Sequence, residues 1–583
     1  MQKGGFFLLE KPDLEKMFTP EDLNEEHRLI ANTVRDFAVN ELEPRHDEIE
    51  EQKEGVLLEL LQTAGELGLL AADIPEEYGG EGLDKVSSML ITENIVAGGS
   101  FTVAHGAHTG IGSLPIVFFG NEEQKKKYLP DLASGKKIAA YCLTEPGSGS
   151  DALAAKAKAV LSEDGKHYII NGTKQFITNA GIADVFIVYA KVDGEKFTAF
   201  IIEKGTEGLS LGAEEDKMGI KGSSTRSVIL EDAKVPVENV LFEIGKGHVV
   251  AFNILNIGRY KLGAGCIGSS KFCMGDAIKY SLEREQFGRP IAKFGLIQKK
   301  IALMAAKEYA AESAVYRTAG MISDILEDAE TGMDIAKGIE EYAIECSINK
   351  IFASEVLDFV VDEAVQIHGG YGYIKEYPVE FMYRDSRINR IFEGTNEVNR
   401  LIIPAMLFRK AQKGQLPLIE AAQNLLKEVL SGAMGARPGD EPLAAEQALV
   451  DAAKKIFLMV GGVAVQKYGQ KIDRHQDVLG NLADIATGIF TMESALARTL
   501  KSINALGEDK SVMKANLAKL YIHMTFPEIE FWAREVLSAA AEGDDRRTQL
   551  AMLKRLARFE PIDTITLRRE IALATMEAGK YLT

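Results

Sequence analysis

Apolar residues repeat with helical spacing near the start of the chain. Between residues 21 and 43 they recur close to every 3.6 positions, which predicts an amphipathic helix. These apolar residues are Leu23, Ile30, Val34, Phe37 and Ala38. The same spacing returns over residues 56–70, and Pro75 then interrupts it. We therefore expect residues 20–135 to be helical.

The pattern changes to short β-forming runs near residue 138. Dipeptides that favour tight turns stand between these runs, as in antiparallel sheets built from hairpins. The runs are 138–143, 168–170, 174–178, 185–191, 197–203 and 227–235, and the dipeptides are Asp164-Gly165, Asn171-Gly172 and Asp193-Gly194. The pattern predicts an antiparallel β domain.

Helical spacing returns after Pro236 and holds to about residue 408. A stretch rich in glycine, proline and acidic residues (431–442) then leads into further helical sequence. The predicted fold is α+β in four parts, and the 583 residues leave room for three or four domains. The parts are an N-terminal helical domain (1–137), a middle β domain (138–240), a helical bundle (241–410) and an additional helical domain (411–583).

Charge is distributed unevenly along the chain, whose formal net charge is −19. The first 100 residues hold 8 basic and 23 acidic side chains, whereas residues 411–583 hold 22 of each sign. Nucleic-acid-binding proteins normally present a basic face, so we do not expect nucleic acid as a partner.

The four cysteines show neither disulfide-framework nor zinc-site spacing, so we expect reduced thiols and no metal. No apolar run approaches the roughly 18 residues of a membrane-spanning helix. The N-terminus resembles neither a signal peptide nor a transit sequence. These features predict a cytoplasmic protein.

Two glycine-rich stretches could approach a ligand closely. The first, YCLTEPGSGSD at 141–151, combines two glycines with hydroxyl side chains and could bind a flat ring or a phosphate, although a surface turn has the same composition. The second, QIHGGYGY at 366–373, follows helical sequence. It could be a helix C-cap, but three glycines within four residues also suit close passage of a ligand.

A third stretch, RIFEGTNE at 390–397, places Glu393 between Phe392 and Gly394. Thr395 is a good N-cap for the helix that should follow. A carboxylate among apolar groups has a raised pKa and suits a general base near neutral pH. A lone glutamate is more often solvated, so the stretch alone does not decide its role.

Taken together, these stretches resemble the flavin-dependent acyl-CoA dehydrogenases. The matching motifs, in order, are YCLTEPGSGSD, QFITNAGIAD (175–184), EREQFG (283–288), QIHGGYGY and RIFEGTNEV. The resemblance covers about residues 20–410, and residues 411–583 look like the extra helical domain of the very-long-chain branch in its bacterial form. It implies an N-terminal helical domain, a middle β domain, a four-helix bundle and an additional all-α domain.

The resemblance also implies a site for FAD shared between two subunits, hence a homodimer. The residues implied to bind FAD are Tyr141, Cys142, Leu143, Thr144, Gly149, Ser150, Phe176, Ile177, Thr178, Arg284, Phe287, Phe294, Gln366, Ile367, His368, Gly369, Gly370, Thr395, Asn396 and Glu397. Of these, Arg284, Phe294 and 366–370 would hold the FAD of the neighbouring subunit. Phe176 would cover a face of the flavin where many relatives have tryptophan.

For the reaction, the resemblance implies that Glu393 removes the α-proton of an acyl-CoA while the flavin takes the β-hydrogen as hydride. The product is a trans-2-enoyl-CoA in the first step of fatty-acid β-oxidation, with electrons passed to an electron-transfer flavoprotein. Ser150, Phe252, Asn256, Arg259 and Gly394 would bind the substrate. Some relatives carry the base near position 258, and Gly258 leaves Glu393 as the only candidate.

The sequence constrains the acyl-chain length of the substrate and the partners of the protein less closely. Small residues dominate VAHGAHTGIG (103–112), which leaves volume for a long acyl tail or, alternatively, serves close helix packing. Segment 418–442 carries only Lys427 and Arg437 as cations, so we expect at most peripheral membrane contact. An acyl-CoA oxidase and a non-enzymatic assembly or binding protein of the same fold remain alternatives.

Overall fold

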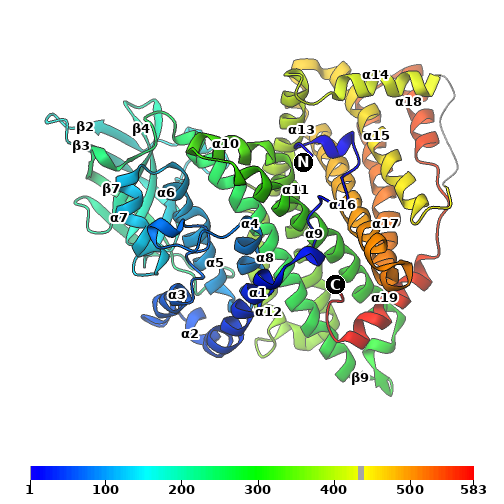
Figure 1. Cartoon of the computed structure of the whole chain (residues 1–583), viewed down its shortest axis with the longest axis horizontal. Coiled ribbons are helices and arrows are strands. Elements are labelled where there is room, and N and C mark those ends of the chain that lie inside the picture. The colour runs from blue at the N-terminus through cyan, green and yellow to red at the C-terminus, as the bar shows by residue number, and fades with distance from the viewer. Residues whose placement is uncertain (1, 431–438) are drawn as a thin grey trace.

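A computed structural model describes residues 2–430 and 439–583. As predicted, the N-terminal part is helical (Figure 1). Its helices are α1 (Glu25–Phe37), α2 (His46–Glu50), α3 (Val56–Glu66), α4 (Lys85–Asn94), α5 (Ser100–Gly106), α6 (Leu114–Phe119) and α7 (Glu122–Ala133). Asn24 caps α1 by accepting a hydrogen bond from the His27 N–H. Between α5 and α6 the chain forms a π-helical turn, Ala107–Gly112, which lies at the site described below.

The middle part is an eight-stranded sheet. Its strands are β1 (Ala139–Cys142), β2 (Lys158–Leu161), β3 (His167–Thr178), β4 (Val185–Val192), β5 (Lys196–Glu203), β6 (Leu209–Glu214), β7 (Thr225–Pro236) and β8 (Val240–Leu241). The order is β6-β7-β3-β2-β4-β5-β8, with β1 beside β4. Most pairs are antiparallel as predicted, but β1 and β2 each pair in parallel with β4.

One of the three predicted turns is wrong. Asp164-Gly165 and Asp193-Gly194 do join hairpin strands, but Asn171-Gly172 lies inside the twelve-residue β3. The pairing of β3 with β7 shifts register there, and a Cβ on Gly172 would lie 2.7 Å from the Ala157 Cβ. The glycine therefore permits a bulge and close backbone approach, not a chain reversal.

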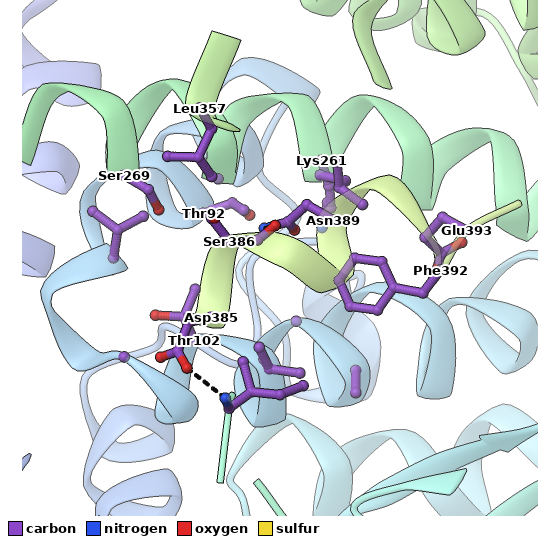
Figure 2. A pocket seen from close by; sticks show the side chains of 18 of the residues that line it. Thr92, Thr102, Lys261, Ser269, Leu357, Asp385, Ser386, Asn389, Phe392 and Glu393 are labelled. Atoms are coloured by element: carbon purple, nitrogen blue, oxygen red, sulfur yellow. Dashed lines mark hydrogen bonds between the residues drawn. The ribbon is translucent and has the colours of Figure 1, made fainter. Parts of the chain in front are cut away.

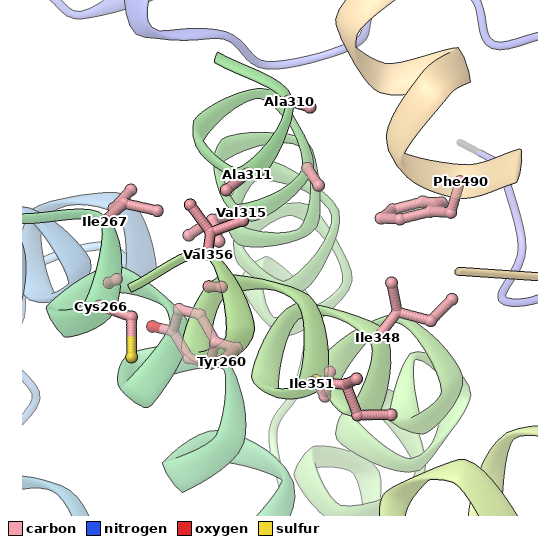
Figure 3. Packing of buried hydrophobic residues seen from close by; sticks show 14 of the residues in the cluster. Tyr260, Cys266, Ile267, Ala310, Ala311, Val315, Ile348, Ile351, Val356 and Phe490 are labelled. Atoms are coloured by element: carbon pink, nitrogen blue, oxygen red, sulfur yellow. The ribbon is translucent and has the colours of Figure 1, made fainter. Parts of the chain in front are cut away.

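A helical bundle follows the sheet. Its long helices are α8 (Gly247–Glu283), α9 (Gly295–Glu327), α11 (Ala343–His368) and α13 (Asn396–Gln412), with the shorter α10 (Gly332–Glu341) and α12 (Val379–Ser386). A small hairpin, β9 (Glu285–Gln286) and β10 (Arg289–Pro290), joins α8 to α9. Figure 3 shows Ile267 of α8, Val315 of α9 and Ile351 of α11 in the core between these helices.

The remaining helices form a second group, which packs as a whole against this bundle, mainly on α9 and α13 (Figure 1). They are α14 (Leu418–Leu430), α15 (Ala444–Tyr468), α16 (Gln476–Leu506), α17 (Glu508–Ala540), α18 (Gly543–Leu556) and α19 (Thr564–Ala578). Most of the predicted 431–442 loop, with Arg437, lies outside the described residues. In the described chain, no helix is long and apolar enough to cross a membrane.

Buried ion pairs join this last set of helices to the bundle. Arg498 of α16 donates to Glu312 of α9 at 2.5 Å and to Glu21, which precedes α1, at 2.8 Å. Lys271 of α8 also contacts Glu312 and lies 2.5 Å from Glu93 of α4. The Arg498 and Glu312 side chains are almost fully buried, so each compensates a charge that would otherwise be desolvated alone.

We predict that Arg498→Met destabilises the protein strongly. Because it leaves the buried Glu312 and the partly exposed Glu21 without their guanidinium partner, the free energy of unfolding should fall by about 3–5 kcal/mol. Denaturant-induced unfolding measures this change. Arg534→Met is the matched control, since Arg534 pairs with Glu530 on an exposed helix face and should cost less than about 1 kcal/mol. Equal effects in the two variants would contradict the importance of the buried pair.

Candidate active site

Glu393 lies in a tight loop immediately before α13. Both Glu393 and Gly394 have positive φ, +57° and +78°. Arg259 of α8 donates to the Glu393 carbonyl at 3.1 Å, and the Asn399 amide donates to the Gly394 carbonyl at 2.8 Å. Thr395 caps α13, as predicted, by accepting from the Val398 N–H at 3.2 Å. These bonds hold the strained loop backbone in place.

The carboxylate of Glu393 is left without a hydrogen bond. Its Oε2 is buried and has no partner among the described residues. A Cβ on Gly258 of α8 would lie 2.7 Å from this oxygen, so the glycine makes room for the carboxylate. Burial raises the pKa of Glu393 to about 7, although the charges of Arg259 and Lys350 oppose that shift. A group with this pKa can take up a proton near neutral pH.

A cavity of about 220 Å³ opens beside Glu393 and Phe392 (Figure 2). Its walls are largely apolar and come from α4, α5, α8, α11, α12 and the π-helical turn. Five members of the 103–112 segment line it: Val103, Gly106, Ala107, Gly110 and Ile111. Two others point elsewhere, since His105 and His108 bond to the backbone carbonyls of Leu69 and Leu132, both at 3.0 Å. The small residues of this segment therefore do face a cavity.

The two predicted cofactor segments of the β domain lie side by side. The Gln175 N–H donates to the Thr144 carbonyl at 2.9 Å, and a buried ion pair of 2.8 Å joins Lys174 to Glu145. The strand continues to Thr178, which lines the cavity. Between Lys174 and Thr178 lies Phe176, which has a φ of +58° and is 62% exposed. A strained backbone therefore holds this aromatic ring exposed to solvent.

Side-chain alternation along the strands separates the predicted residues into two groups. Tyr141 and Leu143 pack on the face of the sheet that meets the helices, whereas Cys142 and Ile177 are buried in the core on the other face. Cys142 and Ile177 can therefore offer only backbone groups to a ligand. Gly149 and Ser150 lie exposed at the end of the loop. The Tyr141 hydroxyl is buried without a hydrogen-bond partner in the described structure.

The predicted substrate residues of α8 share one face of the helix. Phe252, Asn256 and Arg259 are spaced four and three residues apart, and Arg259 donates to the Asn256 side chain at 2.8 Å. Asn256 and Arg259 are buried, while Phe252 is 42% exposed. Arg259 also lies beside Gly394. This face therefore leads from the surface to the Glu393 loop.

The other predicted cofactor residues form a separate site. Arg284, Ile367, His368, Gly369 and Gly370 line a second cavity of about 500 Å³ that shares no lining residue with the first. Beside it Gln366 is exposed. In the neighbouring hairpin Phe287 is 93% exposed, and its ring packs edge-on against Phe294 with 6.0 Å between centroids.

Asn396 lies close to Glu393, but its side chain is occupied. The residue is 2% exposed. Its carbonyl oxygen accepts from Lys350 Nζ at 2.6 Å, and its amide donates to Ser354 at 3.1 Å and Glu355 at 3.0 Å. Glu397 is exposed. Of the predicted residues at the start of α13, Thr395 and Asn396 thus have intramolecular roles, and Glu397 is open to a ligand.

Several polar residues at the cavity were not predicted. Asp385 lines it (Figure 2) and accepts from the Ile220 N–H at 2.5 Å, and burial raises the pKa of Asp385 to about 7. Lys261 also lines it, with its ammonium 2.6 Å from Asp73. Lys350 lies behind the Glu393 loop. These residues stand in helical sequence without a turn signal, so nothing local marks them as site residues. In the described structure, no His, Cys, Asp and Glu cluster could hold a metal ion.

The chain matches models of known protein families along most of its length. Family models described as acyl-CoA dehydrogenase N-terminal, middle and C-terminal domains match residues 24–136, 140–233 and 245–408. A further model, also described as an acyl-CoA dehydrogenase C-terminal domain, matches residues 452–555.

Individual relatives extend over most or all of the chain. A probable acyl-CoA dehydrogenase of Bacillus subtilis is 56% identical over 100% of this chain and 98% of its own length. The mitochondrial very long-chain specific acyl-CoA dehydrogenase of Rattus norvegicus is 37% identical over 82% of this chain and 74% of its own. A crystal structure of an acyl-CoA dehydrogenase complexed with FAD from Bacillus anthracis is 55% identical, with a TM-score of 0.99 over 100% of both chains.

The unpaired carboxylate predicts a pH-dependent cost in stability. Because the folded pKa of about 7 exceeds the ordinary value of 4.5, the folded state loses stability as pH rises from about 4.5 through 7. Glu393→Gln removes this cost, so the variant should be more stable than the wild type at pH 8 by up to about 3 kcal/mol and equal to it near pH 4.5. Unfolding at several pH values measures the difference. The exposed Glu535→Gln is the control, and a destabilised Glu393→Gln at pH 8 would refute the prediction.

Proposed function

Because the chain belongs to the acyl-CoA dehydrogenase family, we propose that it converts a long-chain acyl-CoA to the trans-2-enoyl-CoA in the first step of fatty-acid β-oxidation. The observation that carries this proposal is the Glu393 carboxylate, which is partly buried and has no hydrogen-bond partner in the described structure, at the end of an apolar cavity. Such a group has no hydrogen bond to lose when it takes a proton from a bound substrate.

The residues beside the cavity fit FAD. Phe176 presents an exposed ring from a strained backbone, next to Thr178 of the cavity wall. In the neighbouring loop, Cβ atoms on Gly147 and Gly149 would meet only open space, so a flat ring system could approach the backbone. We assign Tyr141, Leu143, Thr144, Phe176 and Thr178 to the flavin, with Cys142 and Ile177 contributing backbone. When bound, FAD supplies the hydride acceptor for the β-hydrogen.

Glu393 acts as the general base in this proposal. Removal of an α-proton beside a thioester requires a base at a fixed position and a donor for the developing enolate oxygen. Arg259 and Asn399 hold the loop backbone, which fixes the carboxylate next to Gly258. We assign the enolate contact to the Glu393 N–H. Asn256, Arg259, Phe252, Ser150 and Gly394 would guide the CoA moiety toward this point.

The small residues of the cavity wall support a long acyl chain on the substrate. Gly106 and Gly110 face the cavity, and a Cβ on Gly106 would meet nothing within 4 Å. Small residues at these positions leave space for the acyl tail to continue past the helix, which supports a long-chain substrate. The mitochondrial relatives named very long-chain specific are consistent with that substrate class.

The second cavity supports a two-subunit enzyme. Arg284, Phe287, Phe294 and residues 366–370 lie around a separate pocket, and we assign them to the FAD of a second copy. Helices α16 and α19 cover α9, so we expect the assembly to stop at a dimer. An electron-transfer flavoprotein is our proposed acceptor and the cytoplasm the proposed location, with membrane contact at most peripheral.

The reaction can be tested by anaerobic addition of palmitoyl-CoA to the purified FAD-loaded enzyme while the flavin absorbance is recorded. The flavin should bleach in the wild type. Glu393→Gln keeps the shape of the side chain but cannot accept the proton, so flavin reduction should slow by at least about 10²–10⁴-fold with FAD still bound. Near-normal reduction by the variant would refute Glu393 as the base.

Admitting oxygen to the same experiment shows whether the reduced flavin passes its electrons to oxygen or to an electron-transfer flavoprotein. Little hydrogen peroxide should form during turnover, whereas reduction of an electron-transfer flavoprotein should be fast. Stoichiometric peroxide would instead establish an acyl-CoA oxidase. Failure of every acyl-CoA to bleach the flavin would favour a non-enzymatic assembly role for the fold.

We predict that Gly106→Leu shortens the accepted acyl chain. The new side chain would project into the open part of the cavity, so kcat/KM for palmitoyl-CoA should fall at least about tenfold relative to that for butyryl-CoA. Gly462→Leu is the control, because Gly462 is an exposed helical glycine of α15. An equal loss for both substrates would indicate that the glycine serves helix packing.

A further inference from the structure

Lys350 is a buried cation that the reaction as described does not use. It lies on α11, facing α8 and the start of α13, and is 0% exposed. Its ammonium donates to the Asn396 side-chain oxygen at 2.6 Å, which is the hydrogen bond the structure records for it. A lysine buried with a neutral partner is costly, because its charge is desolvated without a directly bonded carboxylate. Such a residue is retained for a reason other than packing.

The hydrogen bond connects Lys350 to the loop that carries Glu393. Asn396 is the first residue of α13 and stands three positions after Glu393. Its amide also bonds to Ser354 and to Glu355 of α11, one turn along from Lys350. The beginning of α13 is thereby held against α11 on one side. Arg259 of α8 holds the Glu393 carbonyl on the other.

The second connection is electrostatic. Glu393 and Lys350 interact through space, and neither has a direct bond to the other. The charged and titratable groups around Glu393 are Arg259 of α8, Lys350 of α11 and Tyr141 of β1. Around Lys350 they are Cys266, Arg259, Glu355, Glu393 and Glu397. Arg259 is already bonded to the loop backbone, so Lys350 is the second cation that acts on the Glu393 carboxylate.

We propose that Lys350 is a positioning residue for the dehydrogenation: its bond to Asn396 holds the Glu393 loop, and its charge keeps the Glu393 carboxylate ionised in an apolar site. This rests on the proposed role of Glu393 as the base. Without Lys350 the desolvated carboxylate would retain its proton to higher pH, and fewer molecules would hold a base ready for the substrate.

Removal of Lys350 should change how the rate of flavin reduction depends on pH. Loss of the Lys350 charge raises the pKa of Glu393, so the acid limb of the pH–rate profile moves to higher pH. Burial also lowers the pKa of Lys350 itself to about 8, so the wild type loses this charge above that pH. Wild type and a variant without the charge should therefore differ most near pH 6–7 and converge toward pH 9.

The test is the rate of flavin reduction by palmitoyl-CoA, measured by stopped flow from pH 6 to 9 in FAD-loaded enzyme. Lys350→Met should reduce the rate about fivefold at pH 7, for a shift of the acid limb by about one pH unit. The deficit should shrink at pH 9. Lys350→Arg keeps the positive charge, so the acid limb of its pH–rate profile should lie where it does in the wild type. Asn396→Ala keeps the Lys350 charge but loses the hydrogen bond to the Glu393 loop, so it should lower the rate equally at every pH.

A second measurement reads the ionisation of Glu393 without turnover. The stabilisation produced by Glu393→Gln is recorded against pH in the wild type and in Lys350→Met, and its midpoint should move to higher pH in the latter. Lys454→Met is the control, because Lys454 is a buried lysine paired with Glu493 among the C-terminal helices. In Lys454→Met, the stabilisation produced by Glu393→Gln should have the same midpoint pH as in the wild type.

An unshifted acid limb and an unshifted midpoint in Lys350→Met would overturn the inference while leaving the proposed function intact. A wild type that never reduces its flavin would overturn the proposed function instead. In that case the midpoint measurement still reports whether Lys350 acts on Glu393.

Discussion

The site depends on a carboxylate that has one buried oxygen and no hydrogen bond in the described structure. Glu393 sits against Gly258 at the end of an apolar cavity, and its Oε2 has no partner in the described structure. Any donor supplied there would stabilise the carboxylate and remove its tendency to take a proton. The protein therefore satisfies the backbone of the loop, through Arg259 and Asn399, and leaves the side chain unsatisfied. The backbone of Glu393 is thus held rigidly by hydrogen bonds, whereas its carboxylate stays free to accept a proton.

Several buried charges elsewhere in the described structure are paired directly, and they show how the fold accommodates a structural charge. Lys174 of β3 pairs with Glu145 of the loop after β1 at 2.8 Å, and Arg498 bridges Glu312 and Glu21. Each of these groups has a direct partner of opposite sign. The free energy lost by desolvation is thereby offset within the pair. Glu393 and Lys350 differ from these pairs, because each interacts with the charge of the other without a direct bond.

Much of this arrangement could be predicted from sequence, but only where the sequence carries a local signal. Glu393 stands between a phenylalanine and a glycine, and Thr395 marks the next helix, so the loop was recognisable. The α+β fold followed from the change in apolar spacing. Asn171-Gly172 misled because a turn dipeptide also suits a bulge within a strand. Lys350 and Asp385 could not be found, since a helical lysine or aspartate shows no sign of what a distant segment brings beside it. The separation of the two cavities likewise arises only from tertiary packing.

The packing of α19 against α9 has a consequence for how the protein is made. Residues 564–578 pack on α9, which is synthesised more than 200 residues earlier, and Tyr581 bonds to Glu312 of α9 at 3.0 Å. Until that last stretch has been synthesised, the part of α9 that it covers stays uncovered and the Glu312 carboxylate lacks its bond from Tyr581. A nascent chain of this length would expose apolar surface for many seconds at ordinary rates of translation. The last helix is therefore needed before the apolar surface of α9 is fully covered.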